Sequence, residues 1–376
     1  MKSALKLARE NFRDLKPCVH GADVFEAANK TGLKRESILD FSSSVNPLGA
    51  SDKALEAAKN NFGQIPSYPD SSSTALRGAI AKHYRGISRC NVVVGNGSTE
   101  LIYLFAEAFL QKGDVAVVPA PSFGEYESAV KRAGAKIRHV KLNPDFCVEP
   151  NSFIRSLTGK SKMIYFCNPN NPTSILTSVE KLTAIVEQAL AKDVLVFLDE
   201  NFLEFVDEGE KFSLIDRVKK FPNLFVLRSF TKIYGLTGLR IGYGIASEEI
   251  VSILSNAKIP WNVNCLAQAA AVAALQDEGH LEKTLSLVRK EKAFLMQELA
   301  KFEAFKVYPP DANFIFIDVR KSGFTAAEVK EKMLGCGVLI RDCTSFAGVD
   351  EYFIRVAVKT RCENEKLLDA FKKTVR

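Results

Sequence analysis

The stretch VLRSFTKIYGLTGLRIGYGIA, residues 226–246, places one lysine, Lys232, between two apolar runs rich in strand-forming residues. The runs 224–227 and 241–245 predict two strands, and we expect the loop between them to fold back into the interior. A lysine held there loses part of its hydration, which lowers its pKa and makes a neutral, nucleophilic amine available. Most loop lysines are simply solvated, but a neutral amine adds to aldehydes.

The neighbours of Lys232 predict a phosphate-binding loop. Ser229 and Thr231 flank the lysine with hydroxyl groups, and Arg240 adds a fixed cation eight residues further on. Hydroxyl donors and a guanidinium are the groups that bind a phosphate. Pyridoxal 5'-phosphate (PLP) carries both an aldehyde and a phosphate, so we expect the rest of the chain to supply what this cofactor needs.

The composition of the 376 residues indicates a soluble enzyme-sized protein with one large and one smaller domain. Hydrophobic residues make up 47% of the chain, and the net charge is +7 without long runs of like charge. These features argue against nucleic acid as a partner and suit anionic substrates. The absence of long apolar stretches and the charges throughout residues 1–16 argue against membrane spans and a signal peptide. Eight scattered cysteines without a CxxC pair indicate reduced thiols in the cytoplasm and no zinc site.

Upstream of the lysine stretch, strand-like and helix-like patterns alternate. Segments with apolar residues at helical spacing separate short β-branched or aromatic runs. The runs predicted as strands, besides the one after Lys232, are 91–95, 114–121, 136–142, 162–169, 193–200 and 223–230. The alternation predicts an α/β fold with a mostly parallel, seven-stranded sheet that is covered on both faces. Ligands of such sheets bind at the carboxyl ends of the strands.

The pattern changes after about residue 279. A long charged helix at 281–302 leads into three short strand-like runs and a closing helix, which predicts a smaller α+β domain. We therefore expect a large PLP-binding domain at 51–280 and a small C-terminal domain at 281–376. Residues 1–50 are expected to join the small domain.

Two strand ends carry groups that suit the pyridine ring of PLP. Asp199 ends a strand in LDEN, where an aspartate most often caps the next helix. An anion at this place would also keep the pyridine nitrogen protonated, so that the ring can draw electrons from the substrate. Asn171 lies in CNPNNPTS, an ordinary turn sequence, and its amide could bond the phenolic oxygen of the ring.

A strand-to-helix turn, VVVGNGSTE, offers a second phosphate contact. The helix expected to begin at Ser98 and Thr99 directs backbone N–H groups and a positive dipole end at an anion. Phe123 and Tyr126 in PSFGEYE are by default core or surface aromatics, although one of them could stack on a flat ring. Each signal is modest by itself, but all of them fall at strand ends.

These motifs resemble the fold type I PLP enzymes of the class I/II aminotransferase superfamily over almost the whole chain. The motifs are SFTKxxGLxGLRxGY at 229–243, NPNNPT at 168–173 and LDEN at 198–201. The resemblance implies that Lys232 binds the cofactor aldehyde covalently, Asp199 pairs the pyridine nitrogen and Asn171 bonds the phenolic oxygen. The further cofactor residues that it implies are Ser98, Thr99, Phe123, Ser229, Thr231, Arg240 and Tyr68. Tyr68, in SYPD, resembles a tyrosine that the partner subunit donates in a homodimer with shared active sites.

Three other stretches, 20–49, 258–271 and 339–358, resemble the threonine-phosphate decarboxylases of the cobalamin pathway. That resemblance implies a carboxy-lyase that converts L-threonine-O-3-phosphate to (R)-1-amino-2-propanol phosphate, or serine phosphate to ethanolamine phosphate. In it Arg355 takes the substrate carboxylate, and Arg341 and His20 contact the phosphate. The substrate residues that it implies are His20, Gly21, Asn46, Asn171, Arg341 and Arg355. Taken singly, each arginine would be a surface ion pair and His20 a solvated ring.

Two residues depart from the superfamily pattern. Ser174 replaces the usual glycine after NPT, so the turn is expected to change its backbone conformation. Phe202 stands where aminotransferases usually have a tyrosine, which favours decarboxylation over transamination. The alternative is an aminotransferase of the histidinol-phosphate type, which shares every cofactor residue. A binding module without activity would be expected to have lost Lys232 or Asp199, and both are present.

Overall fold

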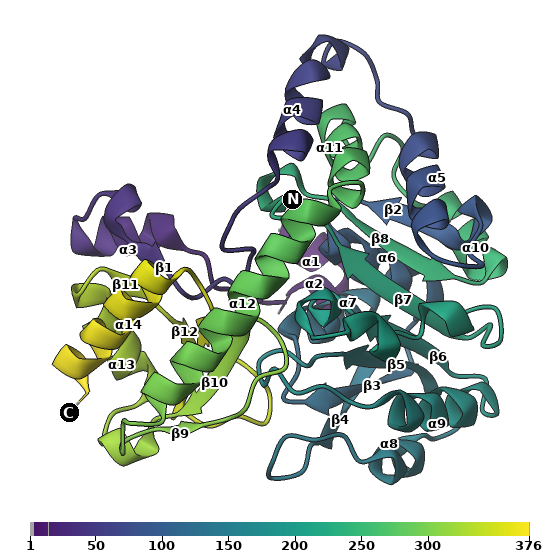
Figure 1. Cartoon of the computed structure of the whole chain (residues 1–376). Helices are drawn as coiled ribbons and strands as arrows, with labels where there is room; N and C mark the ends of the chain where they lie inside the picture. Colours follow the sequence, from purple (N-terminus) through teal and green to yellow (C-terminus); the bar gives the residue numbers. More distant parts are fainter. Residues whose placement is uncertain (1–3, 14, 376) are drawn as a thin grey trace.

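The computed structural model of the chain describes residues 4–13 and 15–375 and contains two main sheets, seen at the right and lower left of Figure 1. The strands are β1 Leu39–Asp40, β2 Val92–Gly95, β3 Val115–Ala120, β4 Lys136–Lys141, β5 Ser161–Cys167, β6 Leu195–Asp199, β7 Leu224–Ser229, β8 Gly242–Ala246, β9 Lys306–Val307, β10 Phe314–Asp318, β11 Val338–Leu339, β12 Arg341–Asp342 and β13 Phe353–Ala357.

The helices fall before, between and after these strands. They are α1 Ala4–Leu7, α2 Glu10–Arg13, α3 Val24–Thr31, α4 Asp52–Asn60, α5 Thr74–His83, α6 Ser98–Phe109, α7 Gly124–Ala133, α8 Pro150–Ser156, α9 Val179–Leu190, α10 Glu248–Ala257, α11 Cys265–Leu275, α12 Glu278–Leu299, α13 Ala326–Gly335 and α14 Arg361–Thr374. Within the described residues, none of them combines the length and the apolar character needed to span a bilayer.

The larger sheet has seven strands in the order β2-β8-β7-β6-β5-β3-β4, and only β8 runs antiparallel to its neighbours. Alternate residues of each strand enter different cores, because side chains of a strand point to opposite faces. Val196 and Leu198 of β6 belong to a core that includes residues of α5, α9 and α11, whereas Phe197 joins residues of α6, α7 and α10. The predicted α/β fold with a mostly parallel, seven-stranded sheet is confirmed.

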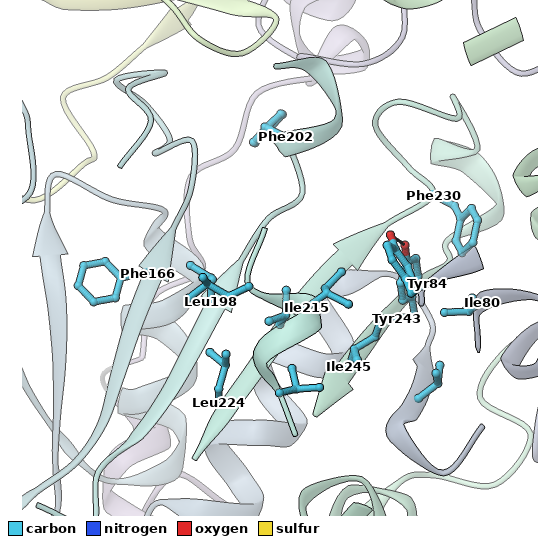
Figure 2. Close-up of a cluster of buried hydrophobic side chains, with 14 of the residues drawn as sticks. Ile80, Tyr84, Phe166, Leu198, Phe202, Ile215, Leu224, Phe230, Tyr243 and Ile245 are labelled. Atoms are coloured by element: carbon cyan, nitrogen blue, oxygen red, sulfur yellow. Dashed lines mark hydrogen bonds between the residues drawn. The ribbon is translucent and has the colours of Figure 1, made fainter. Parts of the chain in front are cut away.

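Figure 2 shows part of the first of these cores, which includes Leu224 and Ile245 from the strands and Ile80 from α5. Tyr84 and Tyr243 are buried there, and their hydroxyl groups lie 2.7 Å apart. Each hydroxyl thus has the partner that burial demands. This core anchors β7 and β8, the two strands on either side of Lys232.

The smaller sheet has the order β12-β13-β10-β9 and is antiparallel throughout. The run around residues 337–343 does not form one strand: β11 pairs with β1, and β12 pairs with β13. The β1 pairing brings residues 39–40 of the N-terminal part beside the C-terminal part of the chain. Figure 1 shows α12 passing between the two sheets. Its Val288 packs in the core of the large sheet, and its Leu295 packs in the core of the small one.

Candidate active site

Lys232 lies in the loop that follows β7, at the carboxyl edge of the large sheet. The loop is held by its own backbone and by Asn46, whose N–H donates to the carbonyl of Lys232 at 3.0 Å. The amide of Asn46 also donates to the carbonyl of Ile233 at 2.7 Å. The backbone around the lysine is thus fixed by a residue from the N-terminal part of the chain.

The surroundings of Lys232 lower the pKa of its amine. Part of the side chain faces the cavity, but protein surrounds it closely, and this desolvation lowers its pKa from 10.5 to about 8. The positive charge of Arg355 acts in the same direction, and the nearby Asp199 opposes both. With a pKa of about 8 most of the amine is protonated at pH 7, but a neutral, nucleophilic fraction is present that an ordinary lysine lacks.

Asp199 ends β6 and is 2% exposed. Burial raises the pKa of its carboxyl to about 6, against the effect of two hydrogen bonds. The hydroxyl of Tyr126 donates to Oδ2 at 2.7 Å, and the N–H of Asn201 donates to Oδ1 at 2.9 Å. Tyr126 is itself fixed by stacking on Tyr165. The two hydrogen bonds fix the orientation of the carboxylate, and a cationic group of a ligand beside it would balance its buried charge.

Two arginines lie next to each other on neighbouring strands of the small sheet. Arg341 of β12 pairs with Arg355 of β13 in the antiparallel register, and they are 6% and 7% exposed. Arg355 donates to the carbonyl of Ser42 and to the amide oxygen of Asn171. Arg341 donates to the carbonyl of Val19 and the hydroxyl of Ser345, at 2.8 Å each.

Neither arginine has a carboxylate within 4.0 Å among the described residues. Desolvation lowers the pKa of both guanidinium groups, to about 10 for Arg355. Two buried, adjacent cations without counter-charges are costly to hold. Such a pair of guanidinium groups suits one or more anionic groups of a ligand.

A second cationic region lies where α6 begins. Thr99, Thr231 and Arg240 line the cavity there together with Ser98, whose hydroxyl accepts from the amide of Asn201 at 3.1 Å. Gly97 precedes the helix with φ +80°, and a Cβ at this position would lie only 2.6 Å from Nη2 of Arg240. The glycine therefore allows the guanidinium to lie directly over the helix N-terminus, and such an arrangement suits a phosphate.

A cavity of about 340 Å³ joins these groups. We call its two sides the sheet wall and the outer wall. The sheet wall consists of Ser98, Thr99, Phe123, Asn171, Asp199, Asn201, Phe202, Thr231, Lys232 and Arg240. The outer wall includes residues 19–22 with Arg341, Ser345, Phe346 and Arg355, and Cys18 and residues 42–44 also line the cavity. His20 and Gly21 thus line the same cavity as the two arginines.

Three predicted site residues do not line this cavity. Ser229 is fully buried behind Thr231, and their hydroxyl groups lie 2.7 Å apart. Asn46 is buried, and its amide donates hydrogen bonds to the carbonyl of Ile233 and the hydroxyl of Thr284, so it supports the lysine loop. Tyr68 is 80% exposed and stacks on Trp261, with ring centroids 4.4 Å apart.

Sequence reasoning missed three residues that the structure places at the site. Asn201 lines the cavity and has a buried amide oxygen without a partner; its only signal was its place in LDEN. Tyr126 was considered as a stacking ring, but it holds Asp199. Glu125 accepts from Tyr103 and lies 2.6 Å from Nε2 of His20, and no motif pointed to it.

Both departures from the family pattern have a structural explanation. Ser174 keeps the left-handed conformation that suits glycine, with φ +65°, so the expected change of the turn is not observed. Its hydroxyl accepts from the N–H of Ala312 at 2.9 Å, which ties the loop after β5 to the segment before β10. Phe202 packs edge-on against Phe314, and Lys232 lies over its ring.

The residues present fit PLP. The cavity combines an amine of lowered pKa, a buried carboxylate and a cationic helix N-terminus, which match the aldehyde, the pyridine nitrogen and the phosphate. Two buried polar atoms of lining residues, Oδ1 of Asn201 and Nε of Arg355, have no protein partner. Such orphaned atoms are expected where a ligand supplies the missing hydrogen bonds.

Comparison with known proteins identifies the family. The family model described as aminotransferase class I and II matches residues 36–371. The chain belongs to the class I and II aminotransferases. PLP is the cofactor of this family, and the histidinol-phosphate aminotransferase of Sinorhizobium meliloti, solved in complex with it, has the same fold (TM-score 0.87, 22% identity, 98% of each chain covered).

Most of the similar proteins found for this aminotransferase chain are named histidinol-phosphate aminotransferase. It is 34% identical over 369 residues to histidinol-phosphate aminotransferase of Methanosphaera stadtmanae, with 98% of both proteins covered. Among solved structures it resembles histidinol-phosphate aminotransferase of Clostridium acetobutylicum (TM-score 0.83, 30% identity, 89% and 98% covered). L-threonine-O-3-phosphate decarboxylase of Porphyromonas gingivalis is also similar (TM-score 0.79, 27% identity, 89% and 99% covered).

The predicted decarboxylation is wrong, and so are the assignments as a carboxy-lyase and to cobalamin biosynthesis. Eight curated relatives that are 32–36% identical over nearly the full length are all histidinol-phosphate aminotransferases. The prediction relied partly on Phe202, but that ring fills a packing position beside Phe314. Packing of this kind does not determine which bond of the substrate breaks.

Proposed function

We propose that this chain is a PLP-dependent aminotransferase of the histidinol-phosphate type. It would move an amino group between a phosphorylated amino alcohol and a 2-oxo acid. The observation that carries the proposal is the pair Arg341 and Arg355, two buried cations that share one cavity with Lys232 and have no carboxylate partner in the described part of the chain. The names of the relatives support the choice of reaction.

The arginine pair suits both halves of an aminotransfer. Histidinol phosphate carries one phosphate and no carboxylate, whereas glutamate carries two carboxylates. A guanidinium binds phosphate and carboxylate with the same bidentate geometry. We infer that Arg355 holds the anionic group nearest the amino group in either substrate. Arg341, with His20 and Gly21, would hold the second anionic charge of the phosphate.

The sheet wall would bind the cofactor. When bound, PLP supplies the aldehyde that takes up the amino group and the ring that accepts electrons from the substrate. Lys232 would hold the aldehyde, Asp199 the ring nitrogen and its proton, and Asn171 the phenolic oxygen. Phe123 would cover one face of the ring. The phosphate would be held by Ser98, Thr99, Thr231 and Arg240, with Ser229 supporting Thr231 from behind.

Lys232 would also move the proton that aminotransfer requires. An amine with a pKa of about 8 could accept a proton from the substrate Cα and later give it up again within the same cavity. Phe202 and the buried surroundings keep bulk water from the amine. The chain would thus use one side chain for both attachment and proton transfer.

We further propose a homodimer in which Tyr68 reaches the partner's cavity, because the exposed Tyr68 and Trp261 form an aromatic pair that nothing covers in the described chain. Eight cysteines without disulfides support a cytoplasmic location. We divide the chain at about residues 50 and 280. The strands of the large sheet lie within 92–246, and those of the small sheet lie within 306–357.

A substrate comparison tests the proposal. The PLP-loaded protein should convert 2-oxoglutarate to glutamate with histidinol phosphate, and at least roughly tenfold more slowly with histidinol, which lacks the phosphate. Threonine phosphate and phosphoserine serve as controls that carry a phosphate but no imidazole. Glutamate formation that is equally fast with and without the phosphate would overturn the substrate assignment.

A further inference from the structure

Three side chains with metal-binding atoms meet at the rim of the cavity. Among the described residues, Cys18, His20 and Glu125 place one ligand atom each within 4.8 Å of one another. Cys18 and His20 come from the segment before α3, and Glu125 comes from the first turn of α7. Cys18 has no part in the proposed aminotransfer, so the cluster needs an explanation of its own.

The carboxylate of Glu125 is oriented as in a metal site. Its side chain is buried, and the hydroxyl of Tyr103 donates to Oε2. This hydrogen bond leaves Oε1 to face Nε2 of His20 at 2.6 Å. A carboxylate fixed by an outer hydrogen bond is typical of metal ligands.

The thiol of Cys18 lies close to His20 and Glu125 because Gly124 has no side chain to exclude it. A Cβ on Gly124 would lie 2.7 Å from Sγ of Cys18, so any other residue there would push the sulfur away. The close approach holds the thiol near the carboxylate of Glu125 and the ring of His20.

We propose that Cys18, His20 and Glu125 form a binding site for zinc or a closely similar transition metal ion. Sulfur, nitrogen and oxygen ligands together favour zinc, whereas calcium and magnesium require oxygen ligands. The thiolate and the carboxylate balance the charge of a divalent ion, and the thiol proton is released on binding. His20 and Glu125 must separate from 2.6 Å to roughly 3.3 Å, the spacing of ligand atoms on a tetrahedral zinc.

The bound ion would inhibit the enzyme. It engages His20 and lies at the rim of the cavity where the substrate phosphate is proposed to enter, with its open fourth position toward the cavity that Cys18 and His20 line. Zinc should therefore raise the KM for histidinol phosphate. This consequence rests on the proposed function, whereas binding of the ion does not.

Calorimetry and cobalt spectroscopy test the site without turnover. The PLP-loaded full chain, freed of metal and kept reduced, should bind one Zn²⁺ per chain. Cys18→Ser and Glu125→Gln should weaken binding at least tenfold, and Cys90→Ser, at an exposed cysteine outside the cavity, should not. Added Co²⁺ should give a thiolate-to-cobalt band in the difference spectrum of the unchanged chain and of Cys90→Ser.

The binding measurements test the metal site, and the kinetic measurements test whether the bound ion inhibits the enzyme. Unsaturable binding, or a Cys18→Ser variant that binds zinc and shows the cobalt band like the unchanged chain, would overturn the site. Should Glu125→Gln fail to fold, the near-isosteric Cys18→Ser decides alone. If zinc binds but leaves the KM for histidinol phosphate unchanged, the inhibitory role is wrong while the site stands. Cys18→Ser should keep its basal activity and lose the inhibition.

Discussion

The two walls of the cavity are built in different ways. The sheet wall consists mainly of side chains at strand ends or helix starts of one sheet, such as Asp199 on β6 and Lys232 after β7. The outer wall is assembled from the N-terminal segment 19–22 and from two short strands more than 300 residues later. The scaffold therefore fixes the groups that suit the cofactor, whereas long-range contacts fix the groups that suit the substrate. Changes in the sheet wall should abolish reactivity, and changes in the outer wall should alter selectivity.

The largest effect should follow from Lys232→Ala. Without the amine the chain lacks both the attachment point and the proton carrier, so turnover should fall on the order of 1,000-fold or more. Reduction with borohydride followed by peptide mapping should find the cofactor on Lys232 in the unchanged chain and on no lysine in the variant. Attachment to another lysine would refute the assignment of the sheet wall.

Asp199→Asn should lower kcat somewhat less, on the order of 100-fold, because a neutral amide does not hold a proton on the ring nitrogen.

Tyr126→Phe offers a milder test of the same carboxylate. It removes a hydrogen bond that lowers the pKa of Asp199, so this pKa should rise above about 6. Activity of the Tyr126→Phe variant should then fall at mildly acidic pH more than at pH 8. An unchanged pH profile would show that Tyr126 does not act through Asp199.

The outer wall should affect selectivity. Arg341→Ala should lose about 1.5–3 kcal/mol of phosphate binding and thereby reduce the preference for histidinol phosphate over histidinol. Arg355→Ala should weaken histidinol phosphate and glutamate alike. Measured kcat/KM values for these substrates give the comparison. Identical selectivity of the two variants would contradict the division of labour between the arginines.

A pH titration tests the electrostatics of Lys232 in the cofactor-free protein. Its pKa is about 8 when folded and 10.5 when exposed, so between these values the unfolded chain binds more protons than the folded chain. The free energy of unfolding should therefore rise from pH 8 to pH 10.5 relative to a Lys232→Met variant. Urea unfolding of both proteins across this range gives the difference. A difference that falls with pH would show that the lysine is not desolvated.

The smallest effect concerns Ser174. Ser174→Gly relieves a left-handed conformation worth about 1–2 kcal/mol and loses a hydrogen bond worth about 1 kcal/mol, so stability should hardly change. Ser174→Ala keeps the strain and leaves the buried N–H of Ala312 without a partner, so it should destabilise by about 1–3 kcal/mol. Equal stability of the two variants in urea would show that the hydrogen bond between Ser174 and Ala312 does not stabilise the contact between the loop after β5 and the segment before β10.

The same contrast explains what the sequence could predict. Strand runs and their terminal residues predicted the sheet and brought Asp199, Asn171 and Lys232 together, because parallel strands end at one edge. The sequence predicted short strand-like runs near the C-terminus, and the structure shows that Arg341 and Arg355 lie opposite each other on two paired strands. No local pattern showed that Asn46 supports the lysine loop or that Glu125 meets His20, since these contacts join segments far apart in the chain. The predicted reaction was wrong as well, because the cofactor motifs are shared by aminotransferases and decarboxylases of this fold and do not distinguish the two reactions.

The fate of the amino nitrogen tests the central claim most directly. Histidinol phosphate labelled with ¹⁵N at its amino group would be incubated with the PLP-loaded protein and unlabelled 2-oxoglutarate, and the products analysed by mass spectrometry. We predict one ¹⁵N-labelled glutamate for each histidinol phosphate consumed. Release of CO2 from a phosphorylated amino acid, with no label reaching glutamate from histidinol phosphate, would contradict the proposed aminotransfer.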